Sequence, residues 1–244
     1  MFGTIRNTES ETIDYTFQQG HHTEQTIIVL GHGVTGNKDR PFLVALTEAL
    51  AQVGISTLRM SFSGNGNSEG RFEAATISKE AEDLGCVLTA LDGWTILYVG
   101  HSMGGAVGVL RASQDSRIRG LISLAGMVHT EAFAQREFRH VTPDQGFMWD
   151  EPTCPLSQAF INDMSAITTV VTHAPSIRVP WLLVHGTEDD VVPIQDSLDI
   201  FERANEPKQL VPIEGADHVF SEHTPNMIKI VTEWVRGQIT SILR

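Results

Sequence analysis

Short β-rich apolar runs alternate along this chain with longer segments that carry an apolar residue every three or four positions. The runs occupy residues 26–30, 56–60, 95–99, 120–124, 181–185 and 209–213. Residues 77–91 and 227–242 show the clearest helical period. This alternation is typical of a parallel β-sheet with helices on both faces. We therefore expect an α/β fold, with residues 3–17 adding one or two antiparallel edge strands.

One stretch interrupts the alternation. Residues 127–178 favour helices but have no regular period, and His, Trp, Phe and Pro are scattered through them. Because this stretch lies between two expected strands, it predicts an insertion over one end of the sheet, a lid; a pair of ordinary connecting helices is the alternative. Residues 1–126 and 179–244 are then expected to form the core domain.

The charge of the chain excludes one class of partner. Its formal net charge is −13, with 30 acidic against 17 basic residues and no run of Lys or Arg. A nucleic-acid-binding protein needs a positive surface, so we expect no nucleic-acid partner.

The apolar runs are far shorter than the roughly 20 residues of a membrane helix, so we expect no membrane insertion and a cytoplasmic location. The oligomeric state stays open, with a homodimer among the alternatives.

The segment Gly100-His101-Ser102-Met103-Gly104 directly follows one expected strand and opens a helical segment. In the pattern G-x-S-x-G the serine occupies a strained turn between strand and helix, and the small residues two positions away let the backbone fold tightly. The N-terminus of the following helix favours negative charge that develops nearby. We expect Ser102 to be a nucleophile.

A glycine-rich segment, residues 31–38, follows the first expected strand. An acyl-transfer enzyme must stabilise an oxyanion, and paired backbone N–H groups do so. We expect one N–H from Met103, the residue after the serine, and the other from Val34, with Thr35 as the second choice. A turn that serves only chain reversal is the structural alternative. The phosphate-binding pattern G-x-x-x-x-G-K-[ST] is absent.

Two further strand ends supply an acid and a base in the chain order Ser, acid, His that this architecture uses. Glu188, Asp189 and Asp190 follow one strand, and we expect Asp189 to be the acid, with Asp190 its main rival. Only His218 and His223 come later in the chain. His218 lies in a short loop just after a strand, so we expect it to be the base.

A fifth segment, residues 61–70, contains three glycines but lacks the G-x-G-x-x-G spacing of a nucleotide fingerprint. We expect it to have a structural role at the carboxyl edge of the sheet.

Together, H-G-x-x-G-N-K-D at 32–39, F-S-G-N-G-x-S-E-G at 62–70, G-H-S-M-G-G at 100–105, H-G-T-E-D-x-V-V-P at 185–193 and G-A-D-H at 215–218 resemble the α/β-hydrolase superfamily from about residue 26 onward. The segments look most similar to small bacterial carboxylesterases related to cinnamoyl and feruloyl esterases, and also to monoacylglycerol lipases and serine aminopeptidases. The resemblance implies a mostly parallel eight-stranded sheet and a lid inserted after the sixth strand. It also implies a catalytic triad of Ser102, Asp189 and His218, with Met103 and Val34 as oxyanion donors.

The expected lid departs from the feruloyl-type pattern, in which polar lid groups hold the phenolic end of the substrate. Both tyrosines of this chain, Tyr15 and Tyr98, lie outside residues 127–178. Asp144, Asp150, Asp163 and His129 are alternative polar contacts. The expected substrate contacts are Thr35, His101, His129, Phe133, Phe147, Trp149 and Phe160.

These residues predict a carboxylesterase-type serine hydrolase that acts on a small or medium acyl or aryl ester through an acyl-enzyme. Its partner is a small-molecule ester, and the mechanism needs no metal or organic cofactor. A peptidase or amidase of the same fold is one alternative, and a non-catalytic small-molecule receptor that retains the triad is another.

Overall fold

A seven-stranded sheet forms the centre of the protein, whose computed structural model describes residues 2–21 and 25–242. The strands run in the order β3 (Tyr15–Gln18), β5 (Ser56–Met60), β4 (Thr26–Gly31), β6 (Thr95–His101), β7 (Ile118–Leu124), β8 (Trp181–Gly186) and β9 (Lys208–Ile213). Only β3, at one edge, is antiparallel to its neighbour. The six parallel strands match the six apolar runs, and five of them are one or two residues longer than expected.

The expectation of eight strands in one sheet is wrong for the described residues. β1 (Ile5–Arg6) and β2 (Thr12–Ile13) pair only with each other and form a separate antiparallel hairpin. Ile5 and Ile13 face each other in this pair and are buried in the core that α2 (Ile77–Ala90) also covers. Burial against α2 therefore holds the hairpin in place. Neither of its strands pairs with the free edge of β3, so the central sheet ends there.

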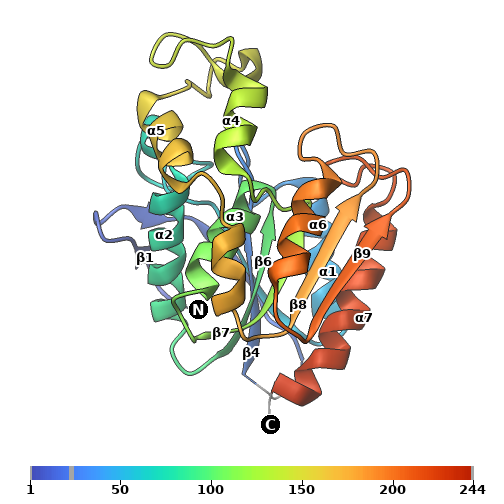
Figure 1. Ribbon diagram of the computed structural model, residues 1–244. Coiled ribbons are helices and arrows are strands. Elements are labelled where there is room, and N and C mark those ends of the chain that lie inside the picture. The colour runs from blue at the N-terminus through green and yellow to red at the C-terminus, as the bar shows by residue number, and fades with distance from the viewer. Residues whose placement is uncertain (1, 22–24, 243–244) are drawn as a thin grey trace.

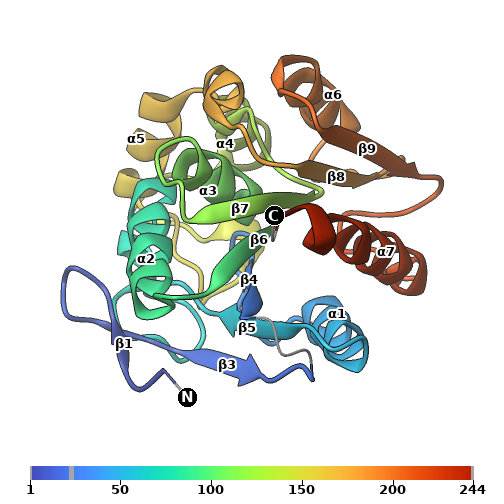
Figure 2. The ribbon, with the colours of Figure 1, turned by 90° about the horizontal axis from the view of Figure 1, so that it is seen from below.

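Helices cover both faces of the sheet (Figure 2). α1 (Pro41–Gln52) and α7 (Thr224–Ile242) pack on one face, and α2, α3 (Met103–Ala112) and α6 (Ile194–Arg203) pack on the other. The side chains of β4 alternate between the two layers: Ile27 and Val29 join the core under α2 and α3, whereas Ile28 and Leu30 join the core under α1 and α7. Both faces of β4 are buried, so residues 27–30 form an unbroken apolar run. The α/β fold class is confirmed.

Residues 127–178 connect β7 to β8 through α4 (Thr130–Phe138), a short 3₁₀ turn η2 (Met148–Asp150), α5 (Gln158–Ile167) and a second 3₁₀ segment η3 (Val171–Ser176). Figure 1 shows α4 and the loop after it projecting beyond the carboxyl ends of the strands. Phe138 packs edge-to-face against Phe133 and Phe160, so α4 and α5 share buried apolar side chains. The lid function of this segment stays a prediction. No helix within residues 2–21 and 25–242 is both long and apolar enough to cross a membrane.

Candidate active site

Ser102 lies at the point where β6 passes into α3, with backbone angles of φ 53° and ψ −120°. A residue with a side chain rarely adopts a positive φ, and such strain costs about 1–3 kcal/mol. Two neighbouring segments fix this conformation, because the Ser102 N–H donates to the Leu124 carbonyl at 3.0 Å and the Ser102 carbonyl accepts from the Met127 N–H at 3.0 Å. The surrounding fold therefore holds the serine in the strained turn that its sequence pattern predicts.

The glycines of the G-x-S-x-G pattern are needed for close backbone approaches. A Cβ on Gly100 would overlap the carbonyl of Gly104, and a Cβ on Gly104 would lie 2.6 Å from the carbonyl oxygen of His32. A Cβ on Gly33 would lie 2.7 Å from the Ser102 Cβ. The absence of side chains at these positions thus brings the loop after β4 directly against the serine.

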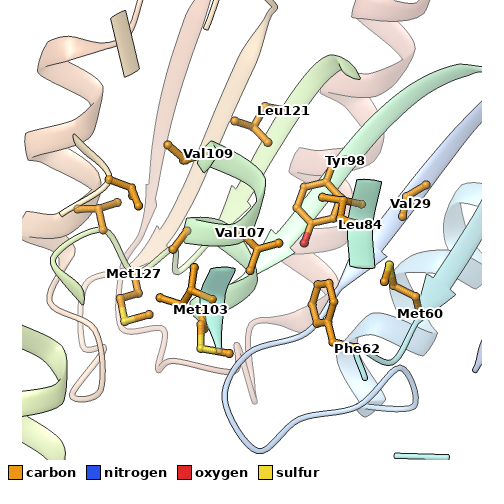
Figure 3. Close-up of a cluster of buried hydrophobic side chains, with 14 of the residues drawn as sticks. Val29, Met60, Phe62, Leu84, Tyr98, Met103, Val107, Val109, Leu121 and Met127 are labelled. Atoms are coloured by element: carbon orange, nitrogen blue, oxygen red, sulfur yellow. The ribbon is translucent and has the colours of Figure 1, made fainter. Parts of the chain in front are cut away.

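A cluster of buried apolar side chains packs around the turn at Ser102. Figure 3 shows Tyr98, Phe62 and Met103 within this cluster. The Tyr98 hydroxyl donates to the Gly104 carbonyl at 3.1 Å, which ties the first turn of α3 to the strand before it. Burial, and then the proximity of Glu80, raises the pKa of Tyr98 well above its usual value, so the phenol stays a neutral donor.

His218 and Asp189, which come from the ends of β9 and β8, meet at hydrogen-bonding distance. The Nδ1 of His218 lies 2.8 Å from Oδ2 of Asp189, whose side chain is 0% exposed. The other carboxylate oxygen, Oδ1, accepts from the N–H groups of Val191 and Val192 at 3.0 and 2.8 Å. With its proton on Nδ1, His218 presents an unprotonated Nε2 to its surroundings.

The rival residues lie elsewhere. Glu188 and Asp190 are both exposed, and neither is hydrogen-bonded to His218 among the described residues. His223 is half-buried just before α7, facing the backbone of Gly215. The structure therefore brings together the acid and the base that the sequence favoured.

His185 contacts Asp189, and the sequence analysis did not predict this contact. Its fully buried ring places Nε2 2.9 Å from the Val192 carbonyl oxygen and 3.2 Å from Asp189 Oδ2, and Nδ1 lies 2.7 Å from Ser197 Oγ. Both neighbours of Nε2 are acceptors, so Nε2 carries a proton. Burial raises the pKa of Asp189, but hydrogen bonds from His185 and then His218 outweigh it and hold the pKa well below its usual value. Asp189 is consequently a carboxylate at neutral pH.

Ser102 and His218 line the same cavity, which has a volume of about 180 Å³. The walls of this cavity consist of Gly33, Val34, Thr35, Gly36, Arg40, Phe42, His101, Ser102, Trp149, Val191, His218 and Val219. Arg40, Phe42, Val191 and Val219 are lining residues that were not expected. Val191 and Val219 lie within the two strand-end segments that carry the acid and the base, so proximity in sequence was an available signal.

The oxyanion role of Val34 and Met103 stays a prediction, and the structure shows where the two residues lie. Val34 lines the cavity, and Met103 is the first residue of α3. Among residues 2–21 and 25–242, neither the Val34 N–H nor the Met103 N–H has a hydrogen-bond acceptor. Thr35, the second choice, also lines the cavity and has a positive φ of 56°. Backbone donors that the protein leaves unpaired are available to a ligand.

The side chain of His32 holds the glycine-rich segment at residues 31–38, which carries Val34, in place. His32 is fully buried, its Nδ1 donates to the Gly33 carbonyl, and its Nε2 accepts from the Phe62 N–H at 3.1 Å. Burial lowers the pKa of His32 to about 4, so the ring is neutral and can accept. Phe62 belongs to the loop at 61–70, whose contacts agree with the structural role expected for it.

The expected substrate contacts divide into two groups. Thr35, His101 and Trp149 line the cavity, whereas His129, Phe133, Phe147 and Phe160 do not. Phe133 and Phe160 are 1% and 2% exposed because they pack α4 and α5 together. The Nε2 of His129 lies 2.9 Å from Asp199 Oδ2 on α6. Phe147 is 42% exposed on the loop after α4.

The alternative polar lid contacts also lie outside the cavity. Asp144 accepts from the Gln158 N–H at the start of α5, and Asp163 accepts from the Ser78 N–H. Their carboxylates thus cap or join helices. The part of the chain that the structure describes holds no group of three or more His, Cys, Asp or Glu that could bind a metal ion. The absence of a cofactor stays a prediction.

Comparisons with known proteins agree with this geometry. The sequence model of the family described as Hydrolase_4, serine aminopeptidase (S33), matches residues 22–145 and 154–223. Palmitoyl-protein thioesterase ABHD10, mitochondrial, of Bos taurus is 23% identical over 223 residues, which cover 84% of this chain and 71% of that protein. The stretch between the two matched ranges, residues 146–153, contains Trp149.

Two solved structures show the same fold. Est1E from Butyrivibrio proteoclasticus with bound ferulic acid superposes with a TM-score of 0.86 at 24% identity, covering 98% of this chain and 100% of that one. Alpha/beta hydrolase domain-containing protein 10 from mouse gives a TM-score of 0.79 at 21% identity and covers 96% of this chain and 98% of that one. At these identities the likeness establishes the α/β-hydrolase fold alone.

Proposed function

The chain belongs to the Hydrolase_4 (serine aminopeptidase, S33) family of α/β hydrolases, and on this basis we propose that it is a serine carboxylesterase. Ser102 is the proposed nucleophile, His218 the base and Asp189 the residue that orients the base. The observation that carries the proposal is the cavity shared by Ser102 and His218, with the Nδ1 of His218 bound to the buried carboxylate of Asp189.

In the proposed reaction, Nε2 of His218 takes the proton of the Ser102 hydroxyl as the oxygen attacks the acyl carbonyl carbon. The negative charge on the carbonyl oxygen is held by the N–H groups of Met103 and Val34. The protonated His218, stabilised by Asp189, gives its proton to the departing alcohol. Water then attacks the acyl-enzyme with His218 again acting as base, which releases the acid and restores Ser102.

The cavity supports an ester with a small acyl or aryl group. Its volume of about 180 Å³ is below the roughly 300–1,000 Å³ of pockets that hold drug-sized ligands. Side chains of Val34, Phe42, Trp149, Val191 and Val219 make much of the wall apolar. The ferulic acid bound to Est1E is an aromatic acid of the kind that such a wall accommodates.

The test is a panel of acetyl, butyryl, octanoyl and feruloyl esters with the wild-type protein and Ser102→Ala. We expect the variant to lose about three or more orders of magnitude in kcat/KM, and mass spectrometry to find the acyl group on the wild-type peptide that contains Ser102. Ser116→Ala, which alters an exposed serine, is the matched control. Equal activity of Ser102→Ala and wild type would refute the proposal.

Two other substrate classes have support from the comparisons. The family description favours a peptidase or amidase, and the relative ABHD10 favours a thioesterase. Esters, amides and thioesters of one acyl group, measured side by side, rank the three activities directly. A receptor that retains these residues would instead bind ligand tightly and show no acyl-enzyme.

We also infer that residues 127–178 act as a lid, because Trp149 brings this segment to the wall of the cavity. Trp149 is 45% exposed, so it lies at the mouth. The division into a core of residues 1–126 and 179–244 and this lid, the cytoplasmic location, the homodimer alternative and the restriction to a small-molecule partner stay predictions.

A further inference from the structure

Arg40 supplies a positive charge at the wall of the proposed active-site cavity. Among the described lining residues there is no carboxylate, and Arg40 is the one Lys or Arg. His101 also lines the cavity, but burial and the nearby His218 lower its pKa to about 3, so it carries no charge at neutral pH. The fixed charge of the cavity wall is thus positive, in a protein whose formal net charge is −13.

Nearby acids are already engaged by other cations. Asp39 lies 2.7 Å from the Lys38 ammonium and 3.5 Å from the Arg59 guanidinium, and Asp14 lies 3.4 Å from Lys38. Arg40 itself forms no ion pair within residues 2–21 and 25–242. Its one side-chain hydrogen bond there runs from Nη2 to the Thr35 carbonyl at 3.1 Å. Most of the guanidinium N–H groups are therefore available to a ligand.

The backbone around Arg40 adds to the positive potential. Arg40 is the N-cap residue of α1, whose first turn contains no acidic residue. The positive end of the helix dipole therefore lies at the Arg40 backbone, and no acidic side chain within the first turn offsets it. Phe42, in the same first turn, lines the cavity together with Arg40. The bond to the Thr35 carbonyl directs the arginine along the loop that carries Val34.

We propose that Arg40 binds a carboxylate of the substrate, so that the preferred ester carries a second, ionised carboxyl group on its acyl or its alcohol part. A guanidinium binds a carboxylate through two parallel N–H···O bonds. Because Arg40 is exposed, the desolvation free energy that opposes this contact is small. In a strongly acidic protein, such a residue attracts an anion that the rest of the surface repels. This inference rests on the proposed esterase function for the reaction itself.

The experiment compares matched esters that differ by one charge. On the acyl side these are 4-nitrophenyl hemisuccinate and 4-nitrophenyl butyrate; on the alcohol side they are 3-carboxyphenyl butyrate and phenyl butyrate. We expect Arg40→Gln to lower kcat/KM for the charged member of at least one pair about ten- to a hundredfold more than for the neutral member. Arg40→Lys should restore part of the difference, and added salt should reduce it in the wild type.

Arg119→Gln is the matched control, because it removes the same charge from an exposed position near the amino end of β7. It should leave both ratios unchanged. If Arg40→Gln leaves both ratios as in the wild type, the proposal is wrong. A greater affinity of Arg40→Gln for the charged ester would also overturn it.

Calorimetric binding separates this proposal from the esterase assignment. In Ser102→Ala, the charged ester of at least one of the two pairs should bind more tightly than its neutral partner, and the Ser102→Ala/Arg40→Gln double variant should lose this difference. If the wild type hydrolyses no ester but this difference in binding is present, the esterase function fails and the carboxylate site stands. If hydrolysis is present and the difference in binding is absent from both pairs, the carboxylate site fails alone.

Discussion

The ring of His101 donates from Nε2 to the backbone carbonyl oxygen of His218 at 2.9 Å, and the two rings lie 4.7 Å apart between centroids. His101 immediately precedes Ser102, so this bond joins the serine turn to the loop that carries the proposed base. Burial is the main cause of the low pKa of His101, which keeps the ring neutral. The bond therefore persists over the whole range of pH near neutrality.

Replacing His101 should disturb the placement of His218. We expect His101→Phe, which keeps a ring against Phe42 but cannot donate, to lower kcat about ten- to a hundredfold while KM changes little. His101→Gln, which retains a donor, should keep more of the wild-type kcat. Steady-state kinetics on a neutral ester measures both. A purely structural role would instead give equal kcat in the folded fraction of each variant.

Sequence reasoning located the strand ends well because each expected site residue lies just after an apolar run. Ser102, Asp189 and His218 come from three different strands, and a parallel sheet brings the carboxyl ends of its strands to one edge. The chain order of serine, acid and histidine, together with the apolar runs, was therefore enough to predict that His218 and Asp189 meet. The same logic placed Val34 at the cavity.

The lid residues could not be placed in this way. Phe133 and Trp149 are both aromatic residues of one irregular stretch, yet one is 1% and the other 45% exposed. Their difference arises from the packing of α4 against α5 and from the left-handed backbone at Trp149, with φ 49°. No sequence period encodes either feature. His185 was missed for a related reason, because its contact with Asp189 arises from a turn of the chain.

The strain at Ser102 has a measurable consequence for stability. Glycine adopts a φ of 53° without a Cβ clash, whereas alanine retains the clash. Relief of about 1–3 kcal/mol of strain exceeds the roughly 0.5–1 kcal/mol that glycine loses in chain entropy. Ser102→Gly should therefore be more stable to urea than Ser102→Ala by about 1 kcal/mol. A less stable glycine variant would show that the turn is not strained.

Asp189 should make stability depend on pH in the acid range. Its folded-state pKa lies below the ordinary value of 3.8, so its contribution is complete above that value and is lost as pH falls through the folded pKa. Asp189→Asn should thus lower the free energy of unfolding more at pH 7 than at pH 3. Asp190→Asn, at an exposed position, is the control.

We also expect Asp189→Asn to lower kcat by about three to four orders of magnitude, because the asparagine does not fix the same tautomer of His218.

Glu80 should have the opposite dependence on pH. It is 1% exposed on α2, and neither carboxylate oxygen has a hydrogen-bond partner among the described residues. Burial, and then the charges of Asp83 and Asp163, raises its pKa well above 4.5. The folded state therefore retains a proton that the unfolded state releases, and stability falls as pH rises from about 4.5 toward the raised pKa.

Glu80→Gln removes this penalty while keeping the shape of the side chain. We expect the variant and the wild type to unfold at similar urea concentrations at pH 4.5, and the variant to be the more stable at pH 8. Glu82→Gln, an exposed change on the same helix, should show no such divergence. If the advantage of Glu80→Gln is equally large at both pH values, the gain comes from packing or hydrogen bonding, and Glu80 is not held in its protonated form by the fold.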